Sequence, residues 1–424
     1  MVSTFVKHEI TKGINLYYLP LTKFKTQTVS INIHTQLSKE TATKNALLPN
    51  VLKRGCKKFP NAQTISEYLE SLYGSVFDCG IHKKGENQII YFHFECIDDQ
   101  YIPDNTNILE KILWFSKQLL LEPIVEKSGF KEDFVVQEKE KLRELIESMI
   151  NNKMTYAVER CYQEMCKNEP FGIYEYGQIE KLKQIDRVEL YQHYQKLIKS
   201  SPIDIFVAGG DKEKDVVEVV KQIFTVPLSE PIAYPTIQRV AQVSEVKKVE
   251  EALDVAQGKL SMGFRTSIAP TDKEYEALMV YNSILGGGPH SKLFNNVREK
   301  LSLAYYVFSR LEKFKSLMII SSGIEIDKFD DASKEIMAQM EAIKIGEISQ
   351  NEFDSAIHYM VNGIRSLQDN AFHMIEYYLG QLISGTDVGL ETLIERIKAV
   401  TKKDVIEVAS NIQLDIIYFL KNKK

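Results

Sequence analysis

Two stretches of the chain show the same succession of hydrophobic and polar positions. In the first, the alternating run Val29–Gln36 predicts a strand, and the helical periodicity of Thr41–Arg54 predicts a helix that ends at Gly55. In the second, Leu260–Thr266 predicts a strand, and Asp272–Leu285 predicts a helix that ends at a run of glycines. The chain therefore carries one strand–helix order twice.

The agreement continues beyond these helices. Each half has a second short helical segment, Ile65–Gly74 or Leu293–Leu301, followed by two β-rich runs that predict a hairpin. The halves also close alike, with PIDIFVAGG and LDIIYFL each following a helical stretch. Between the halves, Thr225–Val243 has three prolines and no helical periodicity, which is typical of a linker. We therefore predict an α+β fold of two homologous domains, 1–224 and 246–424, joined by a linker over 225–245.

The amino-acid composition limits which classes of molecule the protein can bind and where in the cell it is expected. Of the 424 residues, 53 are Lys or Arg and 58 are Asp or Glu, so the chain lacks the basic excess of a typical nucleic-acid binder. Charged residues such as Lys7, Glu9 and Lys12 interrupt any leader-like apolar stretch, and no run approaches the roughly 20 apolar residues of a membrane span. We therefore expect a cytoplasmic protein with no nucleic-acid partner. Its five cysteines include no CxxC pair, which favours reduced thiols.

Three motifs in the second half carry a family resemblance. GFR at Gly263–Arg265, ILGGGPHSKLF at Ile284–Phe294 and REKLSLAYYV at Arg298–Val307 follow one another in order. With the internal repeat, they resemble the pitrilysin and mitochondrial processing peptidase family, the inverted-motif zinc peptidases. The resemblance spans nearly the whole chain and implies two domains that face each other as a clamshell around an unfolded peptide. RCYQEMCKNEPFGIY and PIDIFVAGG look most like the inactive member of a bacterial pair.

The zinc motif of that family is degenerate in this chain. Active members carry H-x-x-E-H on a first-domain helix, where two imidazoles bind zinc and the glutamate acts as general base for the metal-bound water. The resemblance places these three positions at Ala46, Pro49 and Asn50. Alanine and proline side chains offer no lone pair, and an asparagine amide is a poor zinc ligand.

The distal zinc ligand of the family falls on a helix predicted over Lys131–Met154. The register leaves Glu144 or Leu145 at that position, and Leu145 is favoured because Glu138 then matches an earlier glutamate of the family. A single carboxylate would not hold zinc in either register. His82 and His93, on the two arms of the first hairpin, are better explained as ordinary strand histidines than as metal ligands. We therefore predict no bound metal and no cofactor.

Arg298 and Tyr305 match an arginine and a tyrosine with which the family's second domain reaches the zinc site. Both side chains donate hydrogen bonds, which strengthen as a peptide carbonyl oxygen gains negative charge. The resemblance thus implies that they stabilise the substrate carbonyl in a shared site. The alternative is that Arg298 pairs with Glu299 or Glu325 at the surface and Tyr305 is an ordinary strand aromatic.

Two further segments are candidates for substrate binding. Ser30, Asn32 and His34 lie on a strand that we expect at an exposed sheet edge, where an extended peptide can add by backbone pairing. Gly286, Gly287 and Gly288 resemble the glycine-rich loop with which a non-catalytic processing subunit handles substrate. A left-handed helix cap with a flexible turn explains the same three glycines more simply.

These observations predict a catalytically inactive zinc-peptidase homologue. It would supply substrate-binding donors to an active HxxEH paralogue in a heterodimer, or pair with itself, and would bind an unfolded peptide. One alternative is a structural scaffold subunit with no role in catalysis. Another is an autonomous metallopeptidase with atypical ligands.

Overall fold

The computed structural model describes residues 5–103, 106–210, 212–224 and 243–423. The chain forms two compact units. Unit 1 comprises residues 1–147, 173–236 and 370–379, and unit 2 comprises residues 148–172, 237–369 and 380–424. The predicted domain boundaries stay a prediction, and the predicted linker lies largely outside the described residues.

Unit 1 is built on a six-stranded sheet with the strand order β1-β2-β8-β3-β5-β4. The strands are β1 (Val6–Thr11), β2 (Ile14–Leu19), β3 (Thr26–Gln36), β4 (Val76–Lys84), β5 (Asn87–Ile97) and β8 (Ile203–Ala208). The helices are α1 (Ala42–Lys53), α2 (Ala62–Ser71), α3 (Ile108–Leu121), α4 (Glu132–Ser148), α6 (Ile179–Gln184), α7 (Arg187–Ser200) and α8 (Glu213–Ile223). A small hairpin joins β6 (Val125–Glu126) and β7 (Gly129–Phe130).

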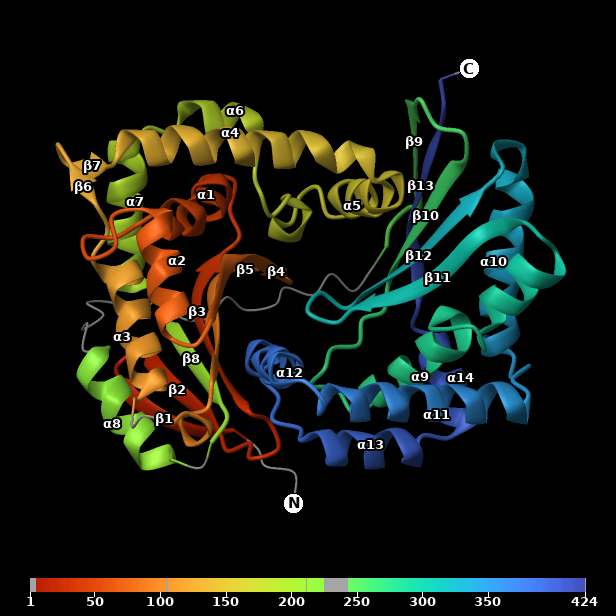
Figure 1. The fold of residues 1–424 in the computed structure, drawn as a ribbon. Coiled ribbons are helices and arrows are strands. Elements are labelled where there is room, and N and C mark those ends of the chain that lie inside the picture. Colours follow the sequence, from red (N-terminus) through yellow and green to blue (C-terminus); the bar gives the residue numbers. More distant parts are fainter. Residues whose placement is uncertain (1–4, 104–105, 211, 225–242, 424) are drawn as a thin grey trace. The chain divides into compact units, whose positions relative to one another are not determined.

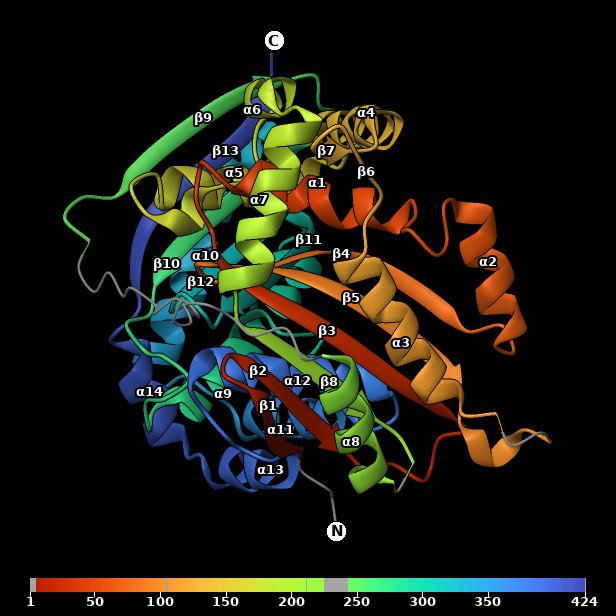
Figure 2. The same cartoon turned by 90° about the vertical axis from the view of Figure 1, so that its left-hand side faces the viewer.

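The core of unit 1 lies between one face of this sheet and its helices. Val29, Ile31 and Ile33 of β3 belong to one buried cluster with Leu47 and Val51 of α1. Figures 1 and 2 show α1, α2 and α3 on that side of the sheet. The alternation in β3 thus directs every second side chain into the core, as its sequence pattern predicts.

Unit 2 has a five-stranded sheet with the order β11-β12-β10-β13-β9. Its strands are β9 (Lys247–Leu253), β10 (Gly258–Arg265), β11 (Ala304–Glu312), β12 (Leu317–Ile324) and β13 (Gln413–Asn422). Its helices are α5 (Lys153–Met165), α9 (Tyr275–Gly286), α10 (Phe329–Lys344), α11 (Gln350–Leu367), α13 (Leu390–Ala399), α14 (Lys402–Ala409) and the π-helix η4 (Leu293–Lys300), while α12 (Ala371–Ser384) begins in unit 1 and ends in unit 2. The predicted hairpins are confirmed as β4–β5 and β11–β12, and both closing strands, β8 and β13, are present. The α+β fold with two sheet-bearing halves is therefore confirmed.

The helix predicted over Lys131–Met154 is interrupted. α4 ends at Ser148, a single 3₁₀ turn follows, and α5 begins at Lys153. The Asn152 side chain accepts a hydrogen bond from the backbone N–H of Thr155 at 3.2 Å and so caps α5. The cap starts α5 as a separate helix, because the asparagine side chain satisfies an amide that a continuous helix would pair internally.

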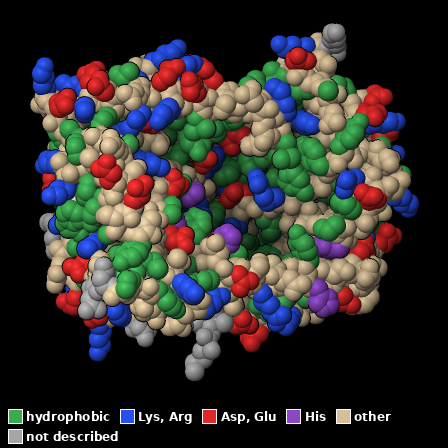
Figure 3. Space-filling view, viewed as in Figure 1, with side chains coloured by type: hydrophobic (Ala, Val, Ile, Leu, Met, Phe, Trp, Pro, Cys, Tyr) green, Lys and Arg blue, Asp and Glu red, His purple; other side chains and the backbone are tan. Residues whose placement is uncertain are grey.

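Charged side chains of both signs are interspersed over the face of the molecule shown in Figure 3. This mixture agrees with the near balance of acidic and basic residues in the sequence. Among the described residues, no helix is both long enough and apolar enough to cross a membrane.

Candidate functional site

The residues at the degenerate motif positions lie on α1, and each has a different environment. Ala46 is 2% exposed and packs in the core of unit 1. Pro49 is buried inside the helix, where its ring leaves the Asn45 carbonyl without the usual helical donor. The Pro49 carbonyl accepts a hydrogen bond from the Cys79 thiol of β4 at 3.3 Å. Asn50 lines a cavity, and neither Ala46 nor Pro49 is among the residues that line the same cavity.

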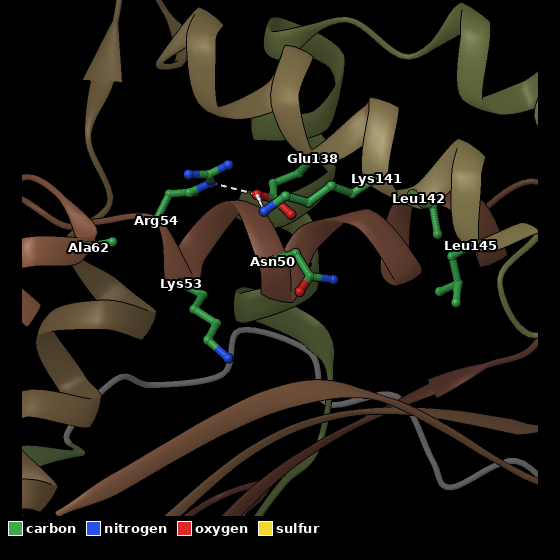
Figure 4. A pocket seen from close by; sticks show the side chains of 8 residues that line it. All are labelled: Asn50, Lys53, Arg54, Ala62, Glu138, Lys141, Leu142 and Leu145. Atoms are coloured by element: carbon green, nitrogen blue, oxygen red, sulfur yellow. Dashed lines mark hydrogen bonds and ion pairs between the residues drawn. The ribbon is translucent and has the colours of Figure 1, made fainter. Parts of the chain in front are cut away.

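That cavity, of about 470 Å³, lies between α1 and α4 and is here called the α1–α4 pocket. Its lining residues are Asn50, Lys53, Arg54, Ala62, Glu138, Lys141, Leu142 and Leu145. Figure 4 shows Glu138, Lys141, Leu142 and Leu145 extending from α4 beside the α1 side chains. Leu145 belongs to the lining whereas Glu144 does not. Which of the two stands at the distal position stays a prediction.

Glu138 is the electrostatic centre of the pocket. Its side chain is 6% exposed, and its Oε1 accepts from Arg54 Nε at 2.5 Å and from Lys141 Nζ at 3.0 Å. Figure 4 shows Arg54 and Lys141 converging on this carboxylate from two helices. The pairing stabilises a buried charge that would be costly alone.

A zinc ion does not fit this pocket. Among its described lining residues, Glu138 alone has a carboxylate, and Arg54 and Lys141 already bind it. Zinc sites in proteins need three or four Cys, His or carboxylate ligands, and three positive side chains here oppose a divalent cation. Across residues 5–103, 106–210, 212–224 and 243–423, no group of three or more His, Cys, Asp or Glu side chains is arranged to hold a metal ion.

Arg298 and Tyr305 lie together in a second cavity, of about 300 Å³, in unit 2. Glu299, Ser302 and Glu325 also line it. The Arg298 guanidinium lies 3.5 Å from Glu299 and 4.7 Å from the centre of the Phe294 ring, while the Tyr305 hydroxyl donates to Glu325 at 3.4 Å. The side chain of Arg298 is 39% exposed and Tyr305 is 53% exposed, so both can be reached from solvent.

The backbone is irregular at both of these residues. Arg298 is on the π-helix η4, where each turn holds an extra residue. Tyr305 is on the edge strand β11, whose pairing with β12 shifts between Ala304 and Tyr306, so Tyr305 is the additional residue of a bulge. Bulges and π-helical turns redirect side chains and are common at functional sites. The sequence pattern predicted a short helix and a strand here but contained no signal for either irregularity.

The expected edge position of Ser30, Asn32 and His34 is wrong. Their strand, β3, pairs with β8 on one side and β5 on the other, so its backbone has no free edge. All three side chains are at most 2% exposed. His34 Nε2 lies 2.8 Å from the Asp204 carboxylate, and the Asn32 amide donates to the Ser30 hydroxyl at 3.1 Å. The strand is central because β8, from the end of the first half, inserts between β2 and β3.

The left-handed cap predicted at the glycine run is also wrong. Gly287 has φ −78°, and neither Gly286 nor Gly288 has a positive φ. A Cβ on Gly286 would lie 2.5 Å from the backbone nitrogen of Ser309 on β11, so close packing explains the glycine there. Gly287 lines a separate cavity of about 290 Å³ with Asn282 and Tyr359. Substrate contact by these glycines stays a prediction.

Comparison with known proteins agrees with this geometry. A family model described as the peptidase M16 inactive domain matches residues 184–360. The chain is 36% identical over 409 residues to the probable inactive metalloprotease YmfF of Bacillus subtilis strain 168, covering 96% of both proteins. It is 25% identical over 308 residues to the probable mitochondrial-processing peptidase subunit beta of Arabidopsis thaliana, covering 69% of this chain and 57% of that protein.

A solved structure extends the likeness to the whole fold. The crystal structure of a conserved protein from Enterococcus faecalis V583 matches with a TM-score of 0.92 and 31% identity, over 99% of each chain. These similarities agree with the degenerate zinc motif on α1. The chain belongs to the M16 peptidases and is an inactive homologue of its zinc proteases.

Proposed function

We propose that this chain is the substrate-binding, non-catalytic subunit of a peptide-processing pair. A second M16 chain carrying HxxEH would supply the zinc and the general base. This chain would supply Arg298 and Tyr305 as donors to the substrate carbonyl. The pairing, the peptide substrate and a cytoplasmic location are all part of the proposal.

The observation that carries the proposal is the placement of Arg298 and Tyr305. They line one cavity, each on an irregular piece of backbone, while the zinc positions of α1 hold residues without ligand atoms suited to zinc. Backbone irregularities cost stability, and their occurrence at the two donors favours a role beyond structure. A guanidinium and a phenol are suited to hold an oxygen that becomes negatively charged during peptide hydrolysis.

A different strand from the one first expected is suited to bind an extended peptide. β4 is an edge strand of the unit 1 sheet, next to α1, and Val76 near its start is 57% exposed. Its outer backbone groups can pair with a peptide of varied sequence. We include this edge in the proposal in place of β3.

The scaffold alternative also has an observation in its favour. Arg298 contacts Glu299 and Tyr305 contacts Glu325, as expected for surface residues without a catalytic partner. The two functions differ in what they predict for conservative substitutions, because surface contacts of this kind contribute little to stability.

The test mixes the purified chain with an HxxEH-bearing M16 chain from the same organism and measures peptide cleavage. Arg298→Gln and Tyr305→Phe are each expected to lower kcat of the mixture by about 10²–10³-fold. Arg396→Gln and Tyr101→Phe, which remove comparable groups from exposed positions, are the matched controls and should leave cleavage unchanged. Wild-type rates with both Arg298→Gln and Tyr305→Phe would establish the scaffold alternative instead.

A further inference from the structure

The α1–α4 pocket has a charge opposite to the one that a zinc site requires. Lys53, Arg54 and Lys141 line it with three positive charges, against one negative charge on Glu138. Asp78 of β4 lies 3.3 Å from Lys53, but both side chains are about half exposed, so solvent screens this pair. The pocket therefore keeps a net positive charge even when Asp78 is included.

The positive side chains keep hydrogen-bond donors that Glu138 does not occupy. Arg54 contacts Glu138 through Nε, and its two terminal nitrogens have no acceptor among the described residues. The Lys141 side chain is 62% exposed, so its ammonium can take a second acceptor from solvent. Asn50 of α1 also lines the pocket and adds a neutral donor, although Figure 4 shows its amide directed away from the Glu138 carboxylate.

The rest of the lining is apolar. Leu142 and Leu145 of α4 and Ala62 at the start of α2 complete the cavity, and Leu145 is 44% exposed. A short aliphatic stem can lie against these side chains while a charged head meets the lysines. The combination suits an amino-acid carboxylate better than a fully hydrated inorganic ion.

We propose that the α1–α4 pocket binds a carboxylate group of the peptide, either an acidic side chain or the C-terminal carboxylate. The position where active relatives hold zinc would then act in this chain as a subsite for an anion. This inference rests on the proposed function, because the carboxylate belongs to the peptide that the proposed function has this chain bind. It adds the chemical class of the group that is recognised.

The test measures binding to the full chain alone by fluorescence anisotropy. The probes are fluorescein-labelled peptides of about ten residues built from Ser, Thr and Val, long enough to pair with one sheet edge. One has a central glutamate and an amidated C-terminus, the second has glutamine in its place, and the third is the glutamine peptide with a free C-terminal carboxylate. At least one carboxylate peptide is expected to bind about tenfold more tightly than the neutral peptide. Comparison of the two carboxylate peptides identifies which carboxylate is recognised.

Variants test whether the preference for carboxylate peptides over the neutral peptide depends on the α1–α4 pocket. The double variant Lys53→Gln/Lys141→Gln should reduce the preference to about twofold or less, since it removes the two most accessible cations. Lys57→Gln/Arg143→Gln removes the same total charge from neighbouring positions outside the pocket and should keep the preference. Glu138→Gln should increase the preference several-fold, because Arg54 and Lys141 lose their competing acceptor.

Equal binding of all three peptides, or no measurable binding of any, would overturn the anion subsite. So would an equal loss of preference in both double variants, because that result would reflect overall charge. The partner chain is absent from this measurement. If the pocket does not bind carboxylates, only the peptide-binding measurement changes, and Arg298→Gln and Tyr305→Phe still lower cleavage by the mixture. If the proposed function is wrong, these two variants leave cleavage by the mixture unchanged.

Discussion

His193 of α7 and Asn45 of α1 form a part-buried polar contact in unit 1. His193 Nε2 lies 2.7 Å from Asn45 Oδ1, while the Asn45 amide nitrogen donates to Gln88 Oε1 at 2.9 Å and to Thr35 Oγ1 at 3.1 Å. Because both amide hydrogens are donated, the Asn45 oxygen acts as the acceptor and His193 Nε2 carries the hydrogen. Burial, with smaller effects from Lys44 and Lys196, lowers the pKa of His193 to about 4.

The lowered pKa of His193 predicts a loss of stability in acid. An unfolded histidine binds a proton below about pH 6.5, whereas folded His193 resists protonation until about pH 4. The contribution is therefore fully present above pH 6.5 and is lost as the pH falls from about 6.5 to 4, by as much as about 3 kcal/mol. Urea unfolding of the wild type and His193→Gln across this range measures the effect.

The variant should show a shallower decline in the free energy of unfolding between these pH values. His358→Gln, at an exposed position, is the control and should follow the wild type. Parallel curves for the wild type and His193→Gln would show that His193 is not responsible.

At the scale of elements, local sequence patterns predicted the type and order of the strands and helices better than they predicted which elements pack or pair with one another. The alternation in Val29–Gln36 predicted β3 correctly, but a period of two cannot reveal which strands flank it, and both faces of β3 are buried. The helix through Lys131–Met154 had continuous periodicity, and the cap at Asn152 that divides it was missed. For the site, the resemblance predicted Asn50 and left Glu144 or Leu145 with a preference for Leu145, whereas the approach of Arg54 to Glu138 depends on the packing of α1 against α4. The Arg54–Glu138 contact joins residues 84 positions apart and has no local signature, whereas Lys141 and Glu138 are three residues apart on α4.

Arg265 of β10 shows how such a long-range contact holds one element to another. Its side chain is 3% exposed and binds Asp415 of β13 at 2.8 Å and Glu169, beyond α5, at 2.6 Å. Lys315 also binds Glu169 at 2.8 Å. The cluster fixes the segment after α5 on the sheet of unit 2.

Arg265→Met is expected to destabilise the protein by about 3–5 kcal/mol, because it leaves the Asp415 carboxylate buried without this cation. Thermal and urea unfolding measure the change. Arg396→Met removes an arginine whose side chain is 53% exposed where it pairs with Glu276, so solvent screens the pair, and it should cost less than about 1 kcal/mol. Similar losses in the two variants would mean that burial of the Arg265 cluster contributes no special stability.

At the scale of the whole molecule, the two compact units do not follow the order of the chain. Residues 148–172 precede the predicted linker but belong to unit 2. Within unit 2, Ala157, Cys161 and Met165 of α5 share one buried cluster with Ile319 of β12 and Ile416 of β13. The amphipathic pattern of α5 predicts that one face is buried, but it contains no information about which sheet covers that face.

A fragment that begins at the predicted boundary should therefore fail to fold on its own. Residues 246–424 lack α5, so the sheet face formed by Leu317, Ile319, Ile416, Tyr418 and Leu420 would lose its cover and be exposed to water. We expect the fragment to be aggregated or to bind a hydrophobic dye strongly. Addition of a synthetic peptide spanning 148–172 should restore a cooperative thermal transition, because it returns both the helix and Glu169, while the same peptide with Ala157→Lys and Cys161→Lys should not. A soluble fragment 246–424 that unfolds cooperatively without the peptide would show instead that unit 2 does not need α5.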